Sequence, residues 1–286
     1  MNLSKLKSLT GDASFRKFYR NKNTIVILSK KETRKNLLIY DAINKILIKN
    51  KIKAPKLIRQ NYKSKYIQIE DFGNISVFQE LKKKNKKKLS YYKQIIKLLI
   101  SLQKIKNKKI KTFLGTSYTV PKYSKKILLN EANLFLEWYI PQKIKKKNQN
   151  LLKKKLILAI KSLINKIKFS NQTFVHRDFH VSNLMIKNKK LCLIDSQDAV
   201  FGNIAYDLAS LIDDVRLKTS KRFKQDIFEE YIKTNKKMNI ENFKNDFEIL
   251  SVLRNLKIIG IFTRLSIRDK KGNYLKLIPY AWRLIE

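Results

Sequence analysis

The chain has 286 residues, and its 65 Lys and Arg residues against 22 Asp and Glu residues give a formal net charge of +43. Hydrophobic residues make up 43% of the sequence, enough for a substantial core, yet no apolar run is long enough to span a membrane. The one cysteine excludes an internal disulfide, and the first residues lack the apolar stretch of a signal peptide. These features together predict a cytoplasmic protein without a membrane partner.

The positive charge is carried mainly by lysines that are spread along the whole chain. An excess of Lys, Ile and Asn, with only 6 Gly and 4 Pro, is what the codons of an AT-rich genome would produce. Aromatic residues do not alternate with the basic runs as a stacking platform for nucleic acids requires. We therefore expect no nucleic-acid partner beyond nonspecific electrostatic attraction. A nucleic-acid-binding module with steeply salt-dependent binding stays the alternative.

The N-terminal quarter is predicted to be rich in strands, and the remainder is predicted to be mainly helical. The expected elements are, in chain order, strands over 11–20 and 24–29, a helix over 32–50, strands over 55–58 and 66–69, and helices over 91–104, 151–167, 207–211 and 221–234. The sequence Asp-Phe-Gly-Asn at 71–74 breaks the strand pattern and predicts a hinge. The chain is thus expected to divide into a lobe over 1–73 and a second lobe over 74–286.

The stretch 174–198 carries the clearest chemical signal, because it contains both histidines of the chain together with Asp178, Asn183 and Asp195. Two apolar runs, 184–186 and 191–194, flank a polar turn and predict a β-hairpin that places Asn183 beside Asp195. An amide oxygen and a carboxylate at one end of a hairpin suit a hard cation, Mg²⁺ above all. Asp178, just upstream, is placed to accept the proton of an attacking hydroxyl.

The order of these residues resembles the catalytic and metal-binding loops of the protein-kinase-like phosphotransferases. The shared pattern is His176-x-Asp178, then four residues and Asn183, then a strand that ends in Ile-Asp195. The resemblance implies an α+β bilobal fold, with a small β-rich nucleotide-binding lobe that has one helix and a larger, mainly helical lobe for catalysis and substrate binding. It also implies Asp178 as the catalytic base, Asn183 and Asp195 as ligands of Mg²⁺ on ATP, and His176 as the residue that orders the loop.

Four further segments resemble one branch of the aminoglycoside-phosphotransferase-like family, the branch of the N-acetylmuramate and N-acetylglucosamine anomeric kinases. They are GDASFRKFYR at 11–20, NLFLEWY at 133–139, IDSQDA at 194–199 and LKIIGIFTR at 256–264. The branch usually has Phe where this chain has Ser196. The resemblance implies an ATP-dependent kinase that phosphorylates the anomeric hydroxyl of an amino sugar in cell-wall recycling. A different small alcohol or an aminoglycoside stays open as the acceptor.

The phosphate-binding residue is not obvious from the sequence. Protein kinases place a Lys on the third strand, but the strand expected over 24–29 contains none, and Lys30 and Lys31 lie at its end. Arg16 or Arg20 can supply the charge instead, because a guanidinium donates bidentate hydrogen bonds to phosphate. We expect Arg16 to contact the nucleotide.

The remaining expected site residues come from the resemblance and from residue type. Ser14 is expected beside the nucleotide phosphates, and Glu70 and Phe72 at the hinge are expected beside the adenine. Asp207 is expected to cap a helix or to brace the catalytic loop from behind. The candidates for the acceptor are Glu137, Trp138 and Arg264, because a sugar site combines polar groups with an aromatic face.

Overall fold

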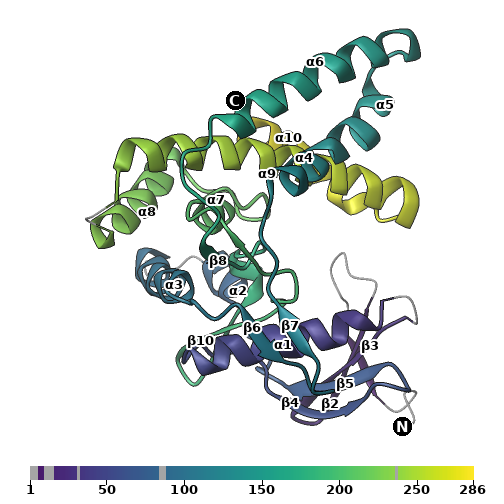
Figure 1. Cartoon of the computed structure of the whole chain (residues 1–286), viewed down its shortest axis with the longest axis vertical. Coiled ribbons are helices and arrows are strands. Elements are labelled where there is room, and N and C mark those ends of the chain that lie inside the picture. The colour runs from purple at the N-terminus through teal and green to yellow at the C-terminus, as the bar shows by residue number, and fades with distance from the viewer. Residues whose placement is uncertain (1–5, 10–15, 31–32, 84–87, 236–237) are drawn as a thin grey trace. The chain divides into compact units, whose positions relative to one another are not determined.

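The computed structural model describes residues 6–9, 16–30, 33–83, 88–235 and 238–286 (Figure 1). The chain packs as two compact units. Unit 1 consists of Met1–Pro121 and His176–Val200, and unit 2 of Lys122–Val175 and Phe201–Glu286. The segment that carries the expected catalytic residues therefore packs with unit 1. The division of functions between 1–73 and 74–286 stays a prediction.

Unit 1 is built on a five-stranded antiparallel sheet with the strand order β1-β2-β3-β5-β4. The strands are β1 (Lys7–Leu9), β2 (Lys17–Asn21), β3 (Thr24–Leu28), β4 (Leu57–Asn61) and β5 (Tyr66–Glu70). In β5 the buried Ile67 and Ile69 alternate with partly exposed residues, as expected for a strand with one face on a core. Helix α1 (Lys35–Lys49) places Leu37 and Tyr40 against Ile27, Ile67 and Ile69, so the core of the sheet lies under this helix.

A β-hairpin is attached to this sheet region by main-chain hydrogen bonds. Its strands are β9 (Leu184–Lys187) and β10 (Lys190–Leu193). The amide of Ile186 donates to the carbonyl of Ile75 at 2.8 Å, and the amide of Leu193 donates to the carbonyl of Lys53 at 2.8 Å. The other elements of unit 1 are α2 (Val77–Lys82), α3 (Lys88–Gln103), β6 (Lys109–Lys111), β7 (Ser117–Thr119) and the short 3-10 helix η3 (Val181–Asn183).

Unit 2 is mainly helical and is organised around α9 (Ile240–Asp269). This helix packs against α4 (Lys125–Leu134), the π-helical η2 (Phe135–Tyr139), α7 (Tyr206–Ile212), η4 (Gly272–Leu277) and α10 (Ile278–Arg283). The unit also contains α5 (Ile140–Lys143), α6 (Lys146–Asn165), β8 (Thr173–Val175), β11 (Val200–Gly202) and α8 (Lys221–Thr234). Gly260 lets α9 approach α4 closely, because a Cβ at this position would lie 2.3 Å from the carbonyl carbon of Leu134.

Most of the elements expected from the sequence are present. Strand β2 confirms the described part of the strand expected over 11–20, and α1, α3, α6, α7 and α8 confirm the expected helices. The buried face of the long helix α9 includes the polar residues Asp246, Arg254 and Asn255, which interrupt the apolar periodicity that marks a helix in a sequence.

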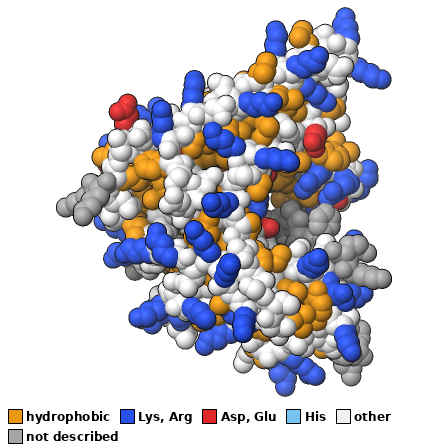
Figure 2. Space-filling model, in the orientation of Figure 1, with side chains coloured by type: hydrophobic (Ala, Val, Ile, Leu, Met, Phe, Trp, Pro, Cys, Tyr) orange, Lys and Arg blue, Asp and Glu red, His pale blue; other side chains and the backbone are white. Residues whose placement is uncertain are grey.

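The surface of both units is strongly basic. Lys and Arg side chains are scattered over the visible face rather than gathered in one patch (Figure 2). Within the described part of the chain, no helix is both long and apolar enough to cross a membrane.

Candidate active site

The hairpin of unit 1 fixes the two predicted metal ligands at one end. Lys187 pairs with Lys190 and Leu184 with Leu193, across a two-residue turn in which Asn188 and Lys189 have φ angles of 51° and 58°. The amide of Ile194 donates to the carbonyl of Asn183 at 3.0 Å. The expected pairing of Asn183 with Asp195 is therefore wrong by one residue, because the second apolar run, 191–194, is one residue longer than the first, and its last residue, Ile194, lies opposite Asn183. Asp195 follows directly, in the left-handed region with φ of 61°.

Asn183 is oriented by the main chain of the predicted base. Its Nδ2 donates to the carbonyl of Asp178 at 3.0 Å and lies 3.4 Å from Nε2 of His180. The same carbonyl accepts from the amide of His180 at 3.0 Å, so the loop folds back on itself. This arrangement brings Asp178 and Asn183 together and leaves Oδ1 of Asn183 available as an acceptor.

Asp195 pairs with Arg16, which lies near the N-terminal end of the chain. Nη2 of Arg16 donates to Oδ1 of Asp195 at 2.8 Å, and Nη1 donates to Oε1 of Gln197 at 3.1 Å. The side chain of Arg16 is only 9% exposed, whereas that of Asp195 is 39% exposed. Burial raises the pKa of the Asp195 carboxyl, Asp178 raises it further, and Arg16 opposes the shift.

Helix α1 supports the same loop through Tyr40 and Asn44. Ser196 Oγ donates to Oδ1 of Asn44 at 2.6 Å, and Nδ2 of Asn44 donates to the carbonyl of Pro55 at 3.1 Å. Burial beside Asp195 raises the pKa of Tyr40 to about 12, so this phenol stays protonated at neutral pH. Ser196, the residue that follows Asp195, is therefore attached to α1 by a hydrogen bond.

His176 lies behind the site and is fully buried. Its Nε2 donates to the carbonyl of Ile194 at 3.1 Å, which ties the start of the catalytic loop to the end of the hairpin. Burial lowers the pKa of His176, although Asp178 and Asp195 act in the opposite direction. A neutral, hydrogen-bonded imidazole fits the predicted role in ordering the loop, which stays a prediction.

The donors at this end of the hairpin fit a magnesium nucleotide. Mg²⁺ in kinase-like sites is held by one or two side-chain oxygens together with phosphate oxygens. Here the oxygens are Oδ1 of Asn183 and a carboxylate whose Oδ2 accepts no hydrogen bond from any described residue. In the described part of the chain, no group of three or more His, Cys, Asp and Glu residues forms a complete metal cage. The arrangement therefore needs oxygens from a ligand to complete it.

The expected adenine edge is held from two sides within unit 1. Nζ of Lys187, at the end of β9, donates to Oε1 of Glu70 and to the carbonyl of Asp71, both at 3.0 Å, and lies 5.5 Å from the ring centre of Phe72. Arg20 donates to both carboxylate oxygens of Asp71. Phe72 is 7% exposed. These contacts fix the segment that would contact the base.

Of the two arginines considered for the phosphates, only one lies beside a predicted metal ligand. Arg20 is engaged at the hinge, where it also donates to the carbonyl of Gly73 at 3.0 Å. Arg16 contacts Asp195. Lys30 is exposed at the end of β3, and Ser14 and Lys31 lie outside the described residues. The geometry favours Arg16 for the phosphate role, which stays a prediction.

The residues expected at the acceptor lie in unit 2. Glu137 is exposed and Trp138 half-buried on η2, and Arg264 is half-buried on α9. Burial lowers the pKa of Arg264, whereas Glu137 raises it, so the two side chains lie within electrostatic reach. Trp138 does not belong to the aromatic cluster of this region, which consists of Phe135, Tyr139 and Trp282.

Two further polar residues of unit 2, Asp207 and Arg254, are buried. Asp207 lies in the first turn of α7 but is not its N-cap, which is Ala205. Arg254 is 4% exposed, and its Nη1 donates to the carbonyl of Asp213 at 3.2 Å. Arg254 is therefore a structural residue of the core of unit 2.

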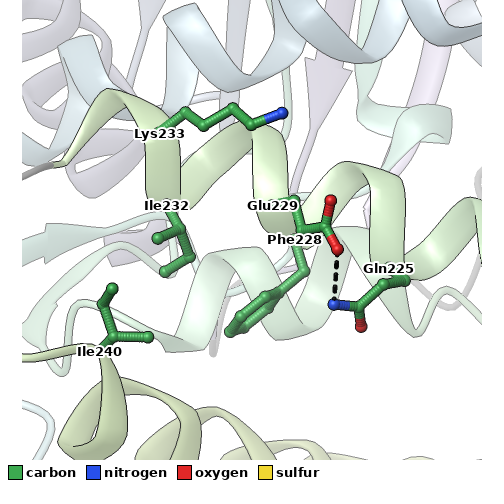
Figure 3. Close-up of a pocket in the computed structure, with 6 residues that line it drawn as sticks. All are labelled: Gln225, Phe228, Glu229, Ile232, Lys233 and Ile240. Carbon is green, nitrogen blue, oxygen red and sulfur yellow. Dashed lines mark hydrogen bonds between the residues drawn. The ribbon is translucent and has the colours of Figure 1, made fainter.

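A surface groove of about 340 Å³ lies between α8 and the start of α9 (Figure 3). Phe228, Ile232 and Ile240 form its apolar wall, and Gln225 donates to Glu229 at 3.0 Å at its rim. None of the predicted site residues lines it. The groove is thus separate from the chemistry of the hairpin.

Several residues of the site were not found from the sequence. Tyr40 and Asn44 stand four residues apart on a helix that was predicted only as a core element. Lys187 was assigned to a turn, and Gln197 carried no signal of its own. The spacing of Tyr40 and Asn44 on one face of α1 is the one signal that was available, because a buried polar pair on an otherwise apolar face requires a partner.

Comparison with protein families gives one match that covers most of the chain. The model described as "Phosphotransferase enzyme family" matches residues 5–239. Among curated proteins, the chain is 26% identical over 282 residues to the N-acetylmuramate/N-acetylglucosamine kinase of Neisseria meningitidis serogroup B, covering 94% of this chain and 80% of that protein. It is 24% identical over 288 residues to the protein of the same name from Pseudomonas aeruginosa, covering 97% and 81%.

Solved structures share the fold. The aminoglycoside phosphotransferase APH(2")-IIa, in its complex with gentamicin, superposes with a TM-score of 0.68 at 16% identity, covering 100% of this chain and 94% of that one. The choline kinase LicA from Streptococcus pneumoniae gives a TM-score of 0.66 at 12% identity, covering 98% and 92%. The α+β, protein-kinase-like fold predicted from the sequence is therefore confirmed.

Proposed function

This chain belongs to the phosphotransferase enzyme family, and from that membership we propose that it is an ATP-dependent kinase whose acceptor is the anomeric hydroxyl of an amino sugar. The observation that carries the proposal is the loop of unit 1, in which Asn183 is bonded to the main chain of Asp178 and is followed across the hairpin by Asp195. A proton acceptor and two oxygen ligands on one rigid element are what a magnesium-dependent phosphoryl transfer requires.

The proposed chemistry assigns one task to each residue. Asp178 takes the proton of the acceptor hydroxyl while the acceptor oxygen forms a bond to the γ-phosphorus, and the bond from that phosphorus to the bridging oxygen breaks to release ADP. Asn183 and Asp195 would hold Mg²⁺, which neutralises phosphate charge when it is bound. Glu70 and Phe72 would contact the adenine, and Arg16 the phosphates.

The identity of the acceptor rests on the relatives. Two of them, from different bacteria, are named N-acetylmuramate/N-acetylglucosamine kinase and align over more than nine-tenths of this chain. Arg264, with a neighbouring Glu137, offers a guanidinium for the carboxylate of N-acetylmuramate. We place the reaction in the cytoplasm, with the sugar as the specific partner and with nucleic acids attracted only through nonspecific charge.

Phosphorus NMR with Mg²⁺·ATP and a panel of acceptors tests the proposal. The panel contains N-acetylmuramate, N-acetylglucosamine, kanamycin and choline. We expect a new phosphomonoester signal, coupled to the anomeric proton, from one or both amino sugars. Phosphorylation of kanamycin or choline alone would move the acceptor to another class, and transfer to none of the four would contradict the proposed function.

A further inference from the structure

Arg20, the fourth residue of β2, joins this strand to the hinge that follows β5. Its Nε and Nη2 donate to the two carboxylate oxygens of Asp71, Nη2 also donates to the carbonyl of Gly73 at 3.0 Å, and Nη1 donates to Oδ1 of Asn74. We propose that Arg20 is a positioning residue for the nucleotide, which fixes the segment 70–73 in the conformation that receives the adenine. This inference rests on the proposed function, which places the base at that edge.

The contact of Arg20 with the hinge joins parts of unit 1 that are not neighbours in its sheet. In the order β1-β2-β3-β5-β4, strand β3 separates β2 from β5. The main chain bonds the start of the hinge only to the turn between β2 and β3, where the amide of Asp71 donates to the carbonyl of Asn23 at 3.2 Å. Arg20 therefore adds a side-chain connection that holds the hinge against β2 itself.

The pair of Arg20 and Asp71 is largely removed from water. The side chain of Arg20 is 18% exposed and that of Asp71 is 9% exposed. A guanidinium that donates to both oxygens of such a carboxylate orients it more firmly than a solvated surface pair does. Oδ1 of Asp71 also accepts from the amide of Gly73 at 2.8 Å, and Gly73 has a φ angle of 86° that favours glycine. Arg20 thus orients the carboxylate, and the carboxylate orients the turn at Gly73.

These contacts also fix the main-chain groups on both sides of Phe72. The carbonyl of Asp71 accepts from Nζ of Lys187, and the carbonyl of Gly73 accepts from Arg20, both at 3.0 Å. The amide of Phe72, which lies between them, has no hydrogen-bond acceptor among the described residues. An N–H group that is held in one direction can donate to a ring nitrogen of a base without a further ordering step.

Strand geometry places Arg20 on the same side of the segment 16–20 as the arginine predicted for the phosphates. Side chains alternate along an extended chain, so residues 16, 18 and 20 point the same way. The guanidinium of Arg16 lies 5.5 Å from the ring centre of Phe18, as expected for neighbours on one side, and it donates to Asp195 at 2.8 Å. One side of this segment therefore contacts both the expected base edge and the expected metal ligand.

Calorimetric titration with Mg²⁺·ATP and with Mg²⁺·tripolyphosphate, which has the phosphates but no base, tests the role of Arg20. In Arg20→Gln the affinity for Mg²⁺·ATP is expected to fall by about tenfold, because the hinge must then be ordered when the base binds. The affinity for Mg²⁺·tripolyphosphate should stay at the wild-type value. Equal losses for the two ligands, which a merely structural role predicts, would overturn the proposal, and so would unchanged affinity for both.

Two further variants complete the test. Arg20→Lys keeps the charge, but an ammonium group cannot reach the four acceptors at once, so its affinity for Mg²⁺·ATP should also fall. If Arg20→Gln does not fold, wild-type affinity in the lysine variant contradicts the proposal. Arg59→Gln removes an exposed charge from β4 of the same sheet and should bind both ligands as the wild type does. Hydrogen exchange at the amide of Gly73 should be faster in Arg20→Gln and unchanged in Arg59→Gln.

Failure of this proposal can be told apart from failure of the proposed function. Transfer of phosphate to no acceptor would refute the kinase reaction, and the two affinities could still be compared. A wild-type protein that binds Mg²⁺·ATP no more tightly than Mg²⁺·tripolyphosphate would refute the base edge at 70–73, and the role of Arg20 with it.

Discussion

Asp195 in unit 1 and Asp246 in unit 2 are two carboxylates with opposite surroundings. Asp246 is fully buried, and each of its oxygens accepts two hydrogen bonds. The donors are the amides of Lys168 and Phe169 and the side chains of Asn203 and Asn245, at 2.7 to 2.9 Å. Asp195 is 39% exposed, has one cation on one oxygen, and lies in a left-handed turn.

The difference separates a structural carboxylate from one that is ready for a ligand. The fixed donors of Asp246 join the segment before β8, the segment before α7 and helix α9, so its charge is fully used inside unit 2. The charge of Asp195 is only partly used, and its pKa is raised by burial. We infer that, of these two carboxylates, Asp195 is the one that can accept a ligand.

The largest effect is expected at Asp178, whose carboxylate is half-buried in the same loop as Asp195. Asp178→Asn removes the proton acceptor but keeps the size of the side chain, so turnover on the true acceptor should fall by about 10²- to 10⁴-fold. Nucleotide affinity, measured by calorimetry, should stay close to that of the wild type. Turnover at the wild-type level would show that another group accepts the proton.

Asp195→Asn tests the ligand-ready carboxylate. Loss of its charge should weaken Mg²⁺·ATP binding by at least about tenfold, equivalent to about 1.4 kcal/mol. Stability should fall less than in the matched change at Asp246, because Oδ1 of the introduced amide can still accept the one hydrogen bond that Arg16 donates at this position. Calorimetric titration and thermal unfolding of the same preparation measure both quantities. Unchanged affinity together with a large loss of stability would make Asp195 a structural residue like Asp246.

Asp246→Asn is the matched change in unit 2. It should lower stability and leave the affinity for Mg²⁺·ATP unchanged. An amide in place of the carboxylate turns an NH₂ group toward donors that need an acceptor, so the free energy of unfolding should fall by about 3 kcal/mol. Chemical denaturation measures this loss. At a temperature where the variant is folded, its affinity for Mg²⁺·ATP should match that of the wild type. A stable variant with weakened nucleotide binding would contradict the assignment.

The smallest effect is expected for the protonation of His176, which makes the stability of the fold depend on pH. Burial keeps its pKa below the ordinary value of 6.5, so the folded chain stays neutral there while the unfolded chain binds a proton. Stability is therefore lost as the pH falls from the unfolded value toward the lowered folded value. Carbon NMR of the imidazole should give a midpoint below 6.5 for His176. A midpoint above it would mean that Asp178 and Asp195 outweigh burial.

Local sequence determined much of the site before any packing was known. The two apolar runs around a polar turn at 184–194 predicted the hairpin, and the spacing of Asp178, Asn183 and Asp195 placed all three at one end of it. These residues are close in sequence, so strand periodicity and a short turn suffice to bring them near one another. The helices α6 and α8 could be predicted for the same reason, since their apolar faces repeat within each helix.

Tertiary structure alone decided which residues meet this end of the hairpin from a distance. Arg16 reaches Asp195, Asn44 reaches Ser196, and Lys187 reaches Glu70 across 117 to 179 residues. Neither residue type nor spacing encodes such contacts, because a lysine or arginine in a chain with 65 of them has many possible partners. The choice among them follows from the antiparallel order of the sheet and the packing of α1, which place these side chains beside the loop.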